Sequence, residues 1–252
     1  MRTTMPATTS VTAAFACAAL LTLTACGPSS DAATGKPSPP SSASAPAKPD
    51  PFAGKDPAAV LRTAYEETER VANKDLVITQ TANGRQITAL LSAEGERVCH
   101  GKVTVMKAGA ADLYFEDGTL SLRADEGFLK DLPEGGARPE ADPEGWISFE
   151  ASSPSVAHLL PLCVQSQPAK TFADRKNVRR EADTSYDQWR VAVFKSTAPG
   201  GAEITDHVLM DGAPYLVRRL VGGPDFARTE YLELPGLSRK PSGSPSAPAR
   251  PA

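Results

Sequence analysis

The sequence lacks the short motifs that mark common enzyme families. Its central part contains no GxSxG nucleophile elbow, no HExxH metal motif, no paired CxxC and no glycine-rich phosphate loop. Its three histidines, His100, His158 and His207, are widely spaced. The sequence therefore gives no catalytic residue, no metal site and no cofactor, and we expect a protein that is not an enzyme. A pair of carboxylates that only the fold brings together stays open as an alternative.

A basic stripe and a long apolar run are also missing. The chain has 27 basic residues, one of which is Arg2 in the N-terminal leader, against 30 acidic residues. The arginine pairs at 179–180 and 218–219 are isolated, a pattern typical of a solvated surface. The main apolar stretch, residues 11–25, is shorter than the roughly 20 residues needed to cross a bilayer. We expect no nucleic-acid partner and no transmembrane helix.

The N-terminal segment is typical of an export signal. Arg2 precedes the apolar stretch, which ends in the tetrapeptide LTAC at residues 23–26. This tetrapeptide resembles the bacterial lipobox, in which the cysteine thiol receives a diacylglyceryl group and the peptidase cuts directly before it. We therefore expect residues 1–25 to be a lipoprotein signal peptide and Cys26 to be the lipid anchor, on the extracytoplasmic face of the cell membrane. An ordinary secretory signal with an accidental cysteine is the alternative.

Composition divides the remaining chain into three parts. Residues 26–55 are dominated by Ser, Ala and Pro, with almost no large apolar side chain before Phe52, so they are predicted to form a disordered tether. Residues 236–252 have the same character and are predicted to be a disordered tail. Residues 56–235 have the size of one domain with an adequate core.

Two of the four cysteines belong to the predicted domain. Cys17 lies in the signal peptide and Cys26 is the predicted anchor, which leaves Cys99 and Cys163 in an oxidising compartment. A disulfide between these two is expected. Two free buried thiols are the alternative, and Cys99 with the adjacent His100 offers too few ligands for a metal site.

A turn motif sets the pairing of two successive strands. The DG pair at residues 117–118 lies between two alternating runs, and a two-residue turn there pairs Phe115 with Leu120 and Leu113 with Leu122. The large apolar side chains then share one face of the sheet.

The strand before this hairpin is predicted at residues 98–107. A three-residue loop at residues 108–110 would pair Val105 with Leu113 and continue the apolar face. By alternation, Cys99 then lies on the same inner face, where a segment that carries the second cysteine must cover it.

Two helices are predicted to cover this face. The first spans residues 56–73, with Asp56 as its N-cap. The second begins at residues 153–154 and carries Cys163, and Pro161 ends or kinks it. Further strands are predicted at residues 76–81, 85–91, 188–194, 203–210, 215–221 and 228–234. Long antiparallel hairpins with few helices are typical of an α+β domain.

These features resemble a family of actinobacterial envelope lipoproteins of the LppX/LprG type. The resemblance covers residues 56–235 and rests on the opening DPAAVLRTAYEETERV helix, the CHGKVTV strand, the DGTLSLRAD turn, the GWISFE segment and the DGAPYLVRRLVGG hairpin. It implies a LolA-like half-barrel, in which a curved antiparallel sheet carries helices on its concave face and leaves an apolar cavity for acyl chains. Several polar strand positions and the predicted disulfide depart from that pattern.

The resemblance implies a membrane-anchored lipoprotein that binds or carries a lipid or another apolar ligand in the cell envelope. Eight residues are predicted to line the space between sheet and helices: Val103, Val105, Leu113, Phe115, Leu120, Leu122, Leu159 and Leu160. The same residues also suit plain core packing. A domain with a filled core would instead be a protein-interaction or regulatory module, with a partner that the sequence does not identify. The volume left open on the concave face separates the two functions.

Overall fold

The computed structural model describes residues 48–82, 84–95, 97–134, 138–223, 226–235 and 237–238. The predicted signal peptide, Cys26, most of the predicted tether and nearly all of the predicted tail lie outside the described residues. The helices are α1 (Pro57–Arg70), α2 (Glu126–Asp131), α3 (Leu160–Val164) and the 3-10 helix η1 (Pro168–Thr171). The strands are β1 (Asn73–Ala82), β2 (Arg85–Glu94), β3 (Val98–Val105), β4 (Gly109–Glu116), β5 (Thr119–Ala124), β6 (Ile147–Glu150), β7 (Lys176–Arg180), β8 (Thr184–Tyr186), β9 (Trp189–Thr197), β10 (Glu203–Leu209), β11 (Leu216–Val221), β12 (Ala227–Tyr231), β13 (Glu233–Leu234) and β14 (Leu237–Ser238).

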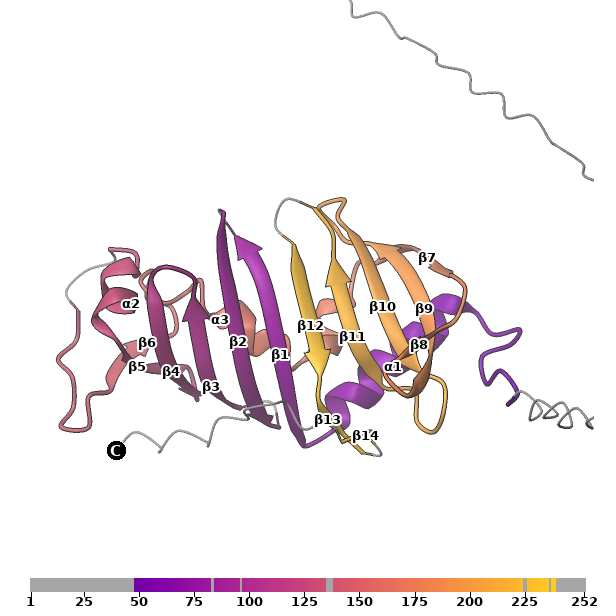
Figure 1. Cartoon of the computed structure of the whole chain (residues 1–252), viewed down its shortest axis with the longest axis horizontal. Coiled ribbons are helices and arrows are strands. Elements are labelled where there is room, and N and C mark those ends of the chain that lie inside the picture. Colours follow the sequence, from indigo (N-terminus) through magenta and orange to yellow (C-terminus); the bar gives the residue numbers. More distant parts are fainter. Residues whose placement is uncertain are drawn as a thin grey trace, which may run out of the picture. The chain divides into compact units, whose positions relative to one another are not determined.

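One curved antiparallel sheet of 12 strands dominates the domain (Figure 1). Its order is β6-β5-β4-β3-β2-β1-β12-β11-β10-β9-β7, and β8 pairs with β9. The chain thus builds two halves of the sheet, β1 to β6 and β7 to β12, and the antiparallel pairing of β1 with β12 joins them. The predicted class, an α+β domain with an antiparallel sheet and few helices, is confirmed.

The helices lie on one face of the sheet, which we call the concave face. Helix α1 crosses the β7–β12 half and buries Leu61 and Tyr65 against it, whereas α3 lies over the β1–β6 half (Figure 1). Asp56 caps α1 as predicted, because its carboxylate accepts a hydrogen bond from the Ala59 N–H at 2.9 Å. The helix ends at Arg70, short of the predicted residue 73, because β1 already begins there.

The β4–β5 hairpin has the predicted register. Phe115 lies opposite Leu120, and Leu113 lies opposite Leu122. Gly118 in the turn has a φ of 82°, which glycine adopts without steric cost. The DG motif therefore predicted both the turn and the face of each side chain.

The β3–β4 turn differs from the prediction. Val105 lies opposite Gly109 rather than Leu113, and the residue with a left-handed conformation in the turn is Lys107, with a φ of 68°. Gly109 instead allows the close approach of Asp125, because a Cβ atom at position 109 would lie 2.0 Å from a carboxylate oxygen of that residue. The shift is even in residues, so every side chain stays on its predicted face.

The segment that covers the β1–β6 half is less helical than predicted. Residues 153–159 form successive turns, and α3 begins only at Leu160. Pro161 lies in the first turn of α3 rather than at its end, a position where its missing N–H costs nothing. The elements β6, β7, β8 and η1 have no counterpart in the prediction, because runs of three to five residues are too short to show a period.

The packed domain begins before the predicted boundary at residue 56. Phe52 is 7% exposed, and its ring lies 6.5 Å from that of Phe194 in an edge-on contact. Asp50 accepts a hydrogen bond from Arg180 at 2.8 Å. Residues 48–55, assigned to the tether from composition, are therefore held on the domain, because a single aromatic side chain and one ion pair are enough to fix so short a segment.

Candidate functional site

The residues predicted to line a ligand space lie on the concave face, mostly inside the packed core. Five of them are fully buried in one hydrophobic cluster: Val103, Leu113, Leu120, Leu122 and Leu159. Val105 belongs to the same cluster and is 6% exposed, whereas Phe115 and Leu160 are half-buried. Side chains therefore fill most of the space in which the sequence places a ligand.

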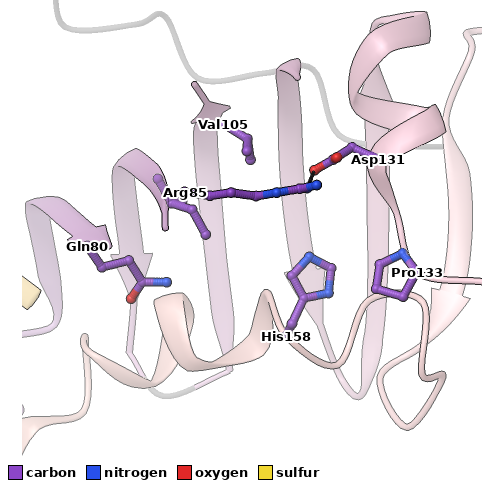
Figure 2. Close-up of a pocket in the computed structure, with 7 residues that line it drawn as sticks. Gln80, Arg85, Val105, Asp131, Pro133 and His158 are labelled. Carbon is purple, nitrogen blue, oxygen red and sulfur yellow. Dashed lines mark hydrogen bonds and ion pairs between the residues drawn. The ribbon is translucent and has the colours of Figure 1, made fainter. Parts of the chain in front are cut away.

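A pocket of about 490 Å³ opens at one end of this half of the sheet (Figure 2). It lies between the ends of β1, β2 and β3, the residues after α2, and the turns that precede α3. Its lining combines buried apolar side chains with a polar margin: Gln80, Arg85, Ile87, Val105, Asp131, Pro133 and His158. Among the eight predicted residues, Val105 contributes to this lining.

An ion pair crosses the pocket. Arg85 reaches from the start of β2 to Asp131 at the end of α2 and donates a hydrogen bond to its carboxylate (Figure 2). The two side chains are 54% and 26% exposed. Such an exposed pair is worth at most about 1 kcal/mol, so a ligand can displace it at little cost.

His158 lies at the margin of the pocket, on the turns that precede α3 (Figure 2). Desolvation lowers the pKa of this imidazole, and the negative charge of Asp131 partly opposes that effect. The ring is therefore neutral at pH 7 and offers one hydrogen-bond donor and one acceptor. His158 and Arg85 together form a polar margin that suits a polar or anionic group of a ligand. Ile87 and Val105 form the apolar floor below it.

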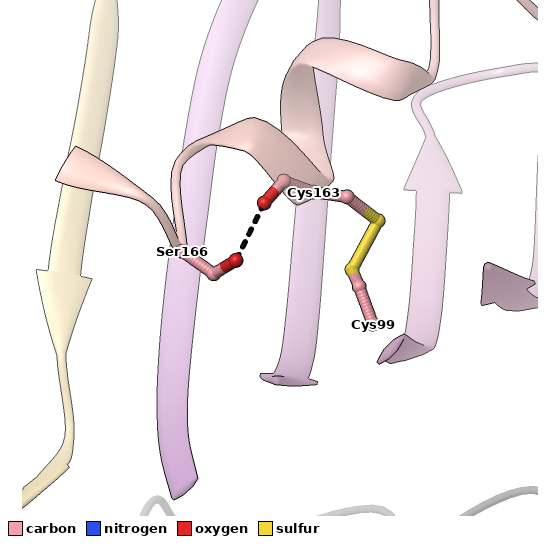
Figure 3. Close-up of a disulfide and its surroundings, with 3 residues drawn as sticks. All are labelled: Cys99, Cys163 and Ser166. Carbon is pink, nitrogen blue, oxygen red and sulfur yellow. Dashed lines mark hydrogen bonds between the residues drawn. A yellow bond between two sulfur atoms is a disulfide. The ribbon is translucent and has the colours of Figure 1, made fainter. Parts of the chain in front are cut away.

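A disulfide ties the covering segment to the sheet (Figure 3). It joins Cys99 of β3 to Cys163 of α3, as the sequence predicts, with a Cα–Cα distance of 5.8 Å. The Ser166 hydroxyl donates a hydrogen bond of 2.7 Å to the carbonyl oxygen of Cys163 and closes the end of α3 (Figure 3). The disulfide at Cys163 thus fixes the segment that carries His158 to the sheet, a few residues after His158 in the chain.

The other half of the concave face contains a buried ionic cluster, made of Tyr65, Arg175, Asp206 and Arg219. The Tyr65 hydroxyl lies 2.9 Å from both carboxylate oxygens of Asp206, and Arg175 donates to that hydroxyl at 3.0 Å. The guanidinium groups approach the carboxylate to 3.8 Å and 3.5 Å. The Asp206 side chain is 0% exposed and the two arginines are 3% and 4% exposed, so α1 is held on the sheet by charges out of contact with water.

The sequence offered one signal for this cluster. In β10 the inward positions run Ile204, Asp206, Val208, so a carboxylate interrupts the apolar pattern. A buried carboxylate requires compensating charge. The partners come from three other parts of the chain, and sequence alone does not bring them together.

Burial shifts the pKa values of this cluster. Desolvation raises the pKa of the Tyr65 hydroxyl far above its ordinary value. It also raises the pKa of the buried Tyr231, on which the charges of Arg219 and Asp206 act, to about 12. Desolvation also raises the pKa of Asp206, while the guanidinium groups of Arg219 and Arg175 act in the opposite direction. The two tyrosines are therefore neutral hydrogen-bond donors at any physiological pH.

In the part of the chain that the structure describes, no three His, Cys, Asp or Glu side chains are grouped to hold a metal ion. No helix in that part is both long and apolar enough to cross a membrane.

No protein-family model matches the sequence, and no curated protein matches it. Solved structures with a similar course of the chain include the lipoprotein LppX of Mycobacterium tuberculosis, with 14% identity over 69% of this chain and 92% of that one and a TM-score of 0.48. LprF from Mycobacterium bovis has 13% identity over 69% and 90%, with a TM-score of 0.44. MucB in the MucA/MucB complex of Pseudomonas aeruginosa has 12% identity over 70% and 55%, with a TM-score of 0.34. At such identities the likeness concerns the fold.

Proposed function

We propose that this chain is a lipoprotein of the cell envelope, anchored through Cys26, that binds a small amphiphilic ligand in the pocket at the ends of β1 to β3. The observation that carries the proposal is the pocket itself. Ile87 and Val105, 8% and 6% exposed, give it an apolar floor, and Arg85 and His158 give it a polar margin. A concave, mostly apolar space with a few polar groups is the usual form of a small-molecule site.

The size of the pocket limits the ligand. Its volume of about 490 Å³ lies within the range of roughly 300–1,000 Å³ usual for small-molecule sites. Because the neighbouring core is packed, a single chain or a compact apolar group fits better than several acyl chains. An anionic head group suits the margin, where Arg85 can exchange its Asp131 partner for the ligand.

Mass spectrometry of the organic extract from the protein purified from its native membrane tests the proposal. We expect one class of amphiphile in stoichiometric amount. Val105→Phe should fill the floor and abolish uptake of a fluorescent fatty acid, while Thr104→Phe, on the exposed side of the same strand, should not. Equal uptake by both variants, or no uptake by the unaltered protein, would reject the pocket as the site.

The anchor has its own test. Cys26→Ala should leave the protein as an uncleaved precursor or release it from the membrane, because only the thioether holds the mature chain there. Cell fractionation with a mass measurement distinguishes these outcomes. A variant that stays in the membrane at the mature mass would reject Cys26 as the anchor.

The packed core favours a second candidate, a protein-interaction module held out on a tether. Five of the eight predicted lining residues have no exposed surface, as expected of a domain whose concave face is structural. If the extract holds no ligand, the unaltered protein takes up no fatty acid and Val105→Phe destabilises the fold by overpacking, this second function replaces the first.

A further inference from the structure

A second cavity, of about 280 Å³, lies at the ends of β2 and β3. We call it the outer cavity. The residues that line it come from the start of β2, the turn after β3 and the end of α2: Gly84, Arg85, Gln86, Met106, Lys107, Ala108 and Asp131. Two of them, Arg85 and Asp131, also line the pocket of the proposed function. The two spaces therefore adjoin each other at this ion pair.

The ion pair separates the two spaces. Along β2, Ile87 lines the pocket and Gln86 lines the outer cavity, and successive side chains of a strand point to opposite faces of the sheet. The Arg85 side chain reaches across the end of the sheet to Asp131 (Figure 2). The guanidinium and the carboxylate thus form the boundary that both spaces share.

The turn that carries Lys107 is fixed in place. The Ala108 N–H donates a hydrogen bond of 3.0 Å to the Val105 carbonyl oxygen and closes the turn. Helix α2 packs closely on the same turn, because a Cβ atom on Gly127 would lie 2.2 Å from the Ala108 carbonyl oxygen. The turn with Lys107 and the helix that ends at Asp131 are therefore held together, and the outer cavity that both of them line is preformed.

The outer cavity carries a surplus of positive charge. Its lining has two cations, Arg85 and Lys107, and one carboxylate, that of Asp131. Lys107 is exposed, and no carboxylate among the described residues pairs with its ammonium group. Charge-assisted hydrogen bonds from guanidinium and ammonium groups to an oxyanion are stronger than those to a neutral acceptor. The outer cavity therefore suits an oxyanion better than a neutral or a cationic group.

We infer that the outer cavity binds the head group of the ligand, a carboxylate or a phosphate on a single apolar chain, and that the Arg85–Asp131 pair opens to admit it. In the bound state Arg85 and Lys107 both contact the oxyanion, while the chain lies over the apolar floor of the pocket. The inference rests on the proposed function, because it needs the pocket to hold the chain. It goes further by naming a second site and a head-group contact, Lys107, that lies outside the pocket.

An exchange of partners at Arg85 is the step that joins the two spaces. The Arg85 and Asp131 side chains are 54% and 26% exposed, so water already screens their attraction. An oxyanion on Arg85 keeps the guanidinium charge compensated, and Asp131 can turn to solvent without leaving a buried charge. Lys107 favours the exchange, because the oxyanion then has two cationic partners.

Competition binding to the mature chain, residues 26–252 with Cys26→Ser, tests the inference. A bound fluorescent fatty acid is displaced by a long-chain fatty acid, by the corresponding alkyl phosphate or by the corresponding alcohol. Lys107→Gln should weaken binding of the acid and of the phosphate about fivefold, the scale of one exposed charge contact, and leave binding of the alcohol unchanged. Lys102→Gln is the matched control, because Lys102 is an exposed lysine of β3 that lines neither space. It should bind all three compounds as the unaltered protein does.

Asp131→Asn should give a result of the opposite sign. Loss of the carboxylate frees Arg85 and removes a negative charge from the outer cavity, so the acid and the phosphate should bind about fivefold more tightly and the alcohol should not. An ion pair with a structural role alone gives no such gain. Glu126→Gln is the control, because Glu126 is an exposed carboxylate of the same helix, and it should change none of the affinities. Affinities are compared among variants with the same Tm, so that loss of folding is not read as loss of a contact.

Two results would overturn the inference and leave the pocket in place. One is the same affinity for the acid in Lys107→Gln and Lys102→Gln. The other is an Asp131→Asn variant that binds the acid no more tightly than the unaltered protein does. In both cases, uptake that Val105→Phe abolishes would still support the pocket. If the unaltered protein takes up no fluorescent fatty acid, the proposed function fails and this inference fails with it.

Discussion

The two halves of the sheet cover their concave faces by different means. Over β1 to β6 the covering segment is short and irregular, packs through apolar side chains, and is tied down by the Cys99–Cys163 disulfide. Over β7 to β12 the cover is the regular helix α1, held by Tyr65 and Asp206 in a buried ionic cluster. The pocket that Val105 borders lies in this half. Buried charges require fixed partners, so the other half has one permitted arrangement.

Removal of a charge from the cluster should have the largest effect. Asp206→Ala leaves two buried guanidinium groups without their carboxylate, and the expected loss is about 5 kcal/mol of unfolding free energy. Chemical denaturation measures it. Glu203→Ala, an exposed carboxylate on the same strand, should cost less than about 1 kcal/mol. A loss below about 2 kcal/mol for Asp206→Ala would mean that the cluster does not hold α1.

Removal of the disulfide tests the other half. Cys163→Ser opens a loop with a sequence separation of 64 residues, and the loop-entropy relation gives a loss of about 4 kcal/mol. Hydrogen exchange should show faster exchange in residues 153–164 than in α1. Uniform loosening of both segments would contradict the independence of the two halves.

Acid should weaken the β7–β12 half through His207. Burial and the charge of Arg218 lower the pKa of this imidazole to about 4, although the charge of Glu230 opposes both effects. The unfolded chain takes up a proton near pH 6.5 while the folded one does not, so stability should fall as the pH drops from about 6.5 to 4. The loss is up to about 3 kcal/mol. His207→Gln should flatten this part of the stability profile, and an unchanged slope would assign it to other groups.

The exposed ion pair of the pocket should have the smallest effect on stability. Arg85→Ala is expected to change the unfolding free energy by less than about 1 kcal/mol, because the Arg85 side chain is 54% exposed. Its effect should appear in ligand binding. Relative to the unaltered protein, Arg85→Ala should reduce the uptake of a fatty acid more than the uptake of the corresponding alcohol. Equal weakening for both would remove Arg85 from head-group recognition.

Local sequence signals predicted much of the sheet. The DG turn gave the register of Leu113 with Leu122, since a two-residue hairpin leaves no freedom in its pairing. The β3–β4 turn could not be predicted in the same way, because Gly109 accommodates Asp125, which follows β5. The prediction failed there because a contact between residues distant in sequence determines the turn, which a local turn rule does not include.

The site was less accessible to sequence reasoning. Alternation identified Val105 as inward-facing, but it could not say which inward residues border empty volume. Which inward residues border empty volume depends on where the covering segment ends. The turns that precede α3, which begins at Leu160, determine that end. The Asp206 cluster was missed because Tyr65, its hydrogen-bond partner, lies 141 residues away in the chain.

The pairing of β1 with β12 has a consequence for how the protein is made. Leu76 in the first strand lies opposite Tyr231 in the last long one. A chain that crosses a membrane with its N-terminus first exposes β1 long before β12 arrives. The edge of β1 must stay unpaired during that interval, and such an edge can join strands of other chains. High separation between paired strands also slows folding. The final closure of the sheet therefore depends on the arrival of β12.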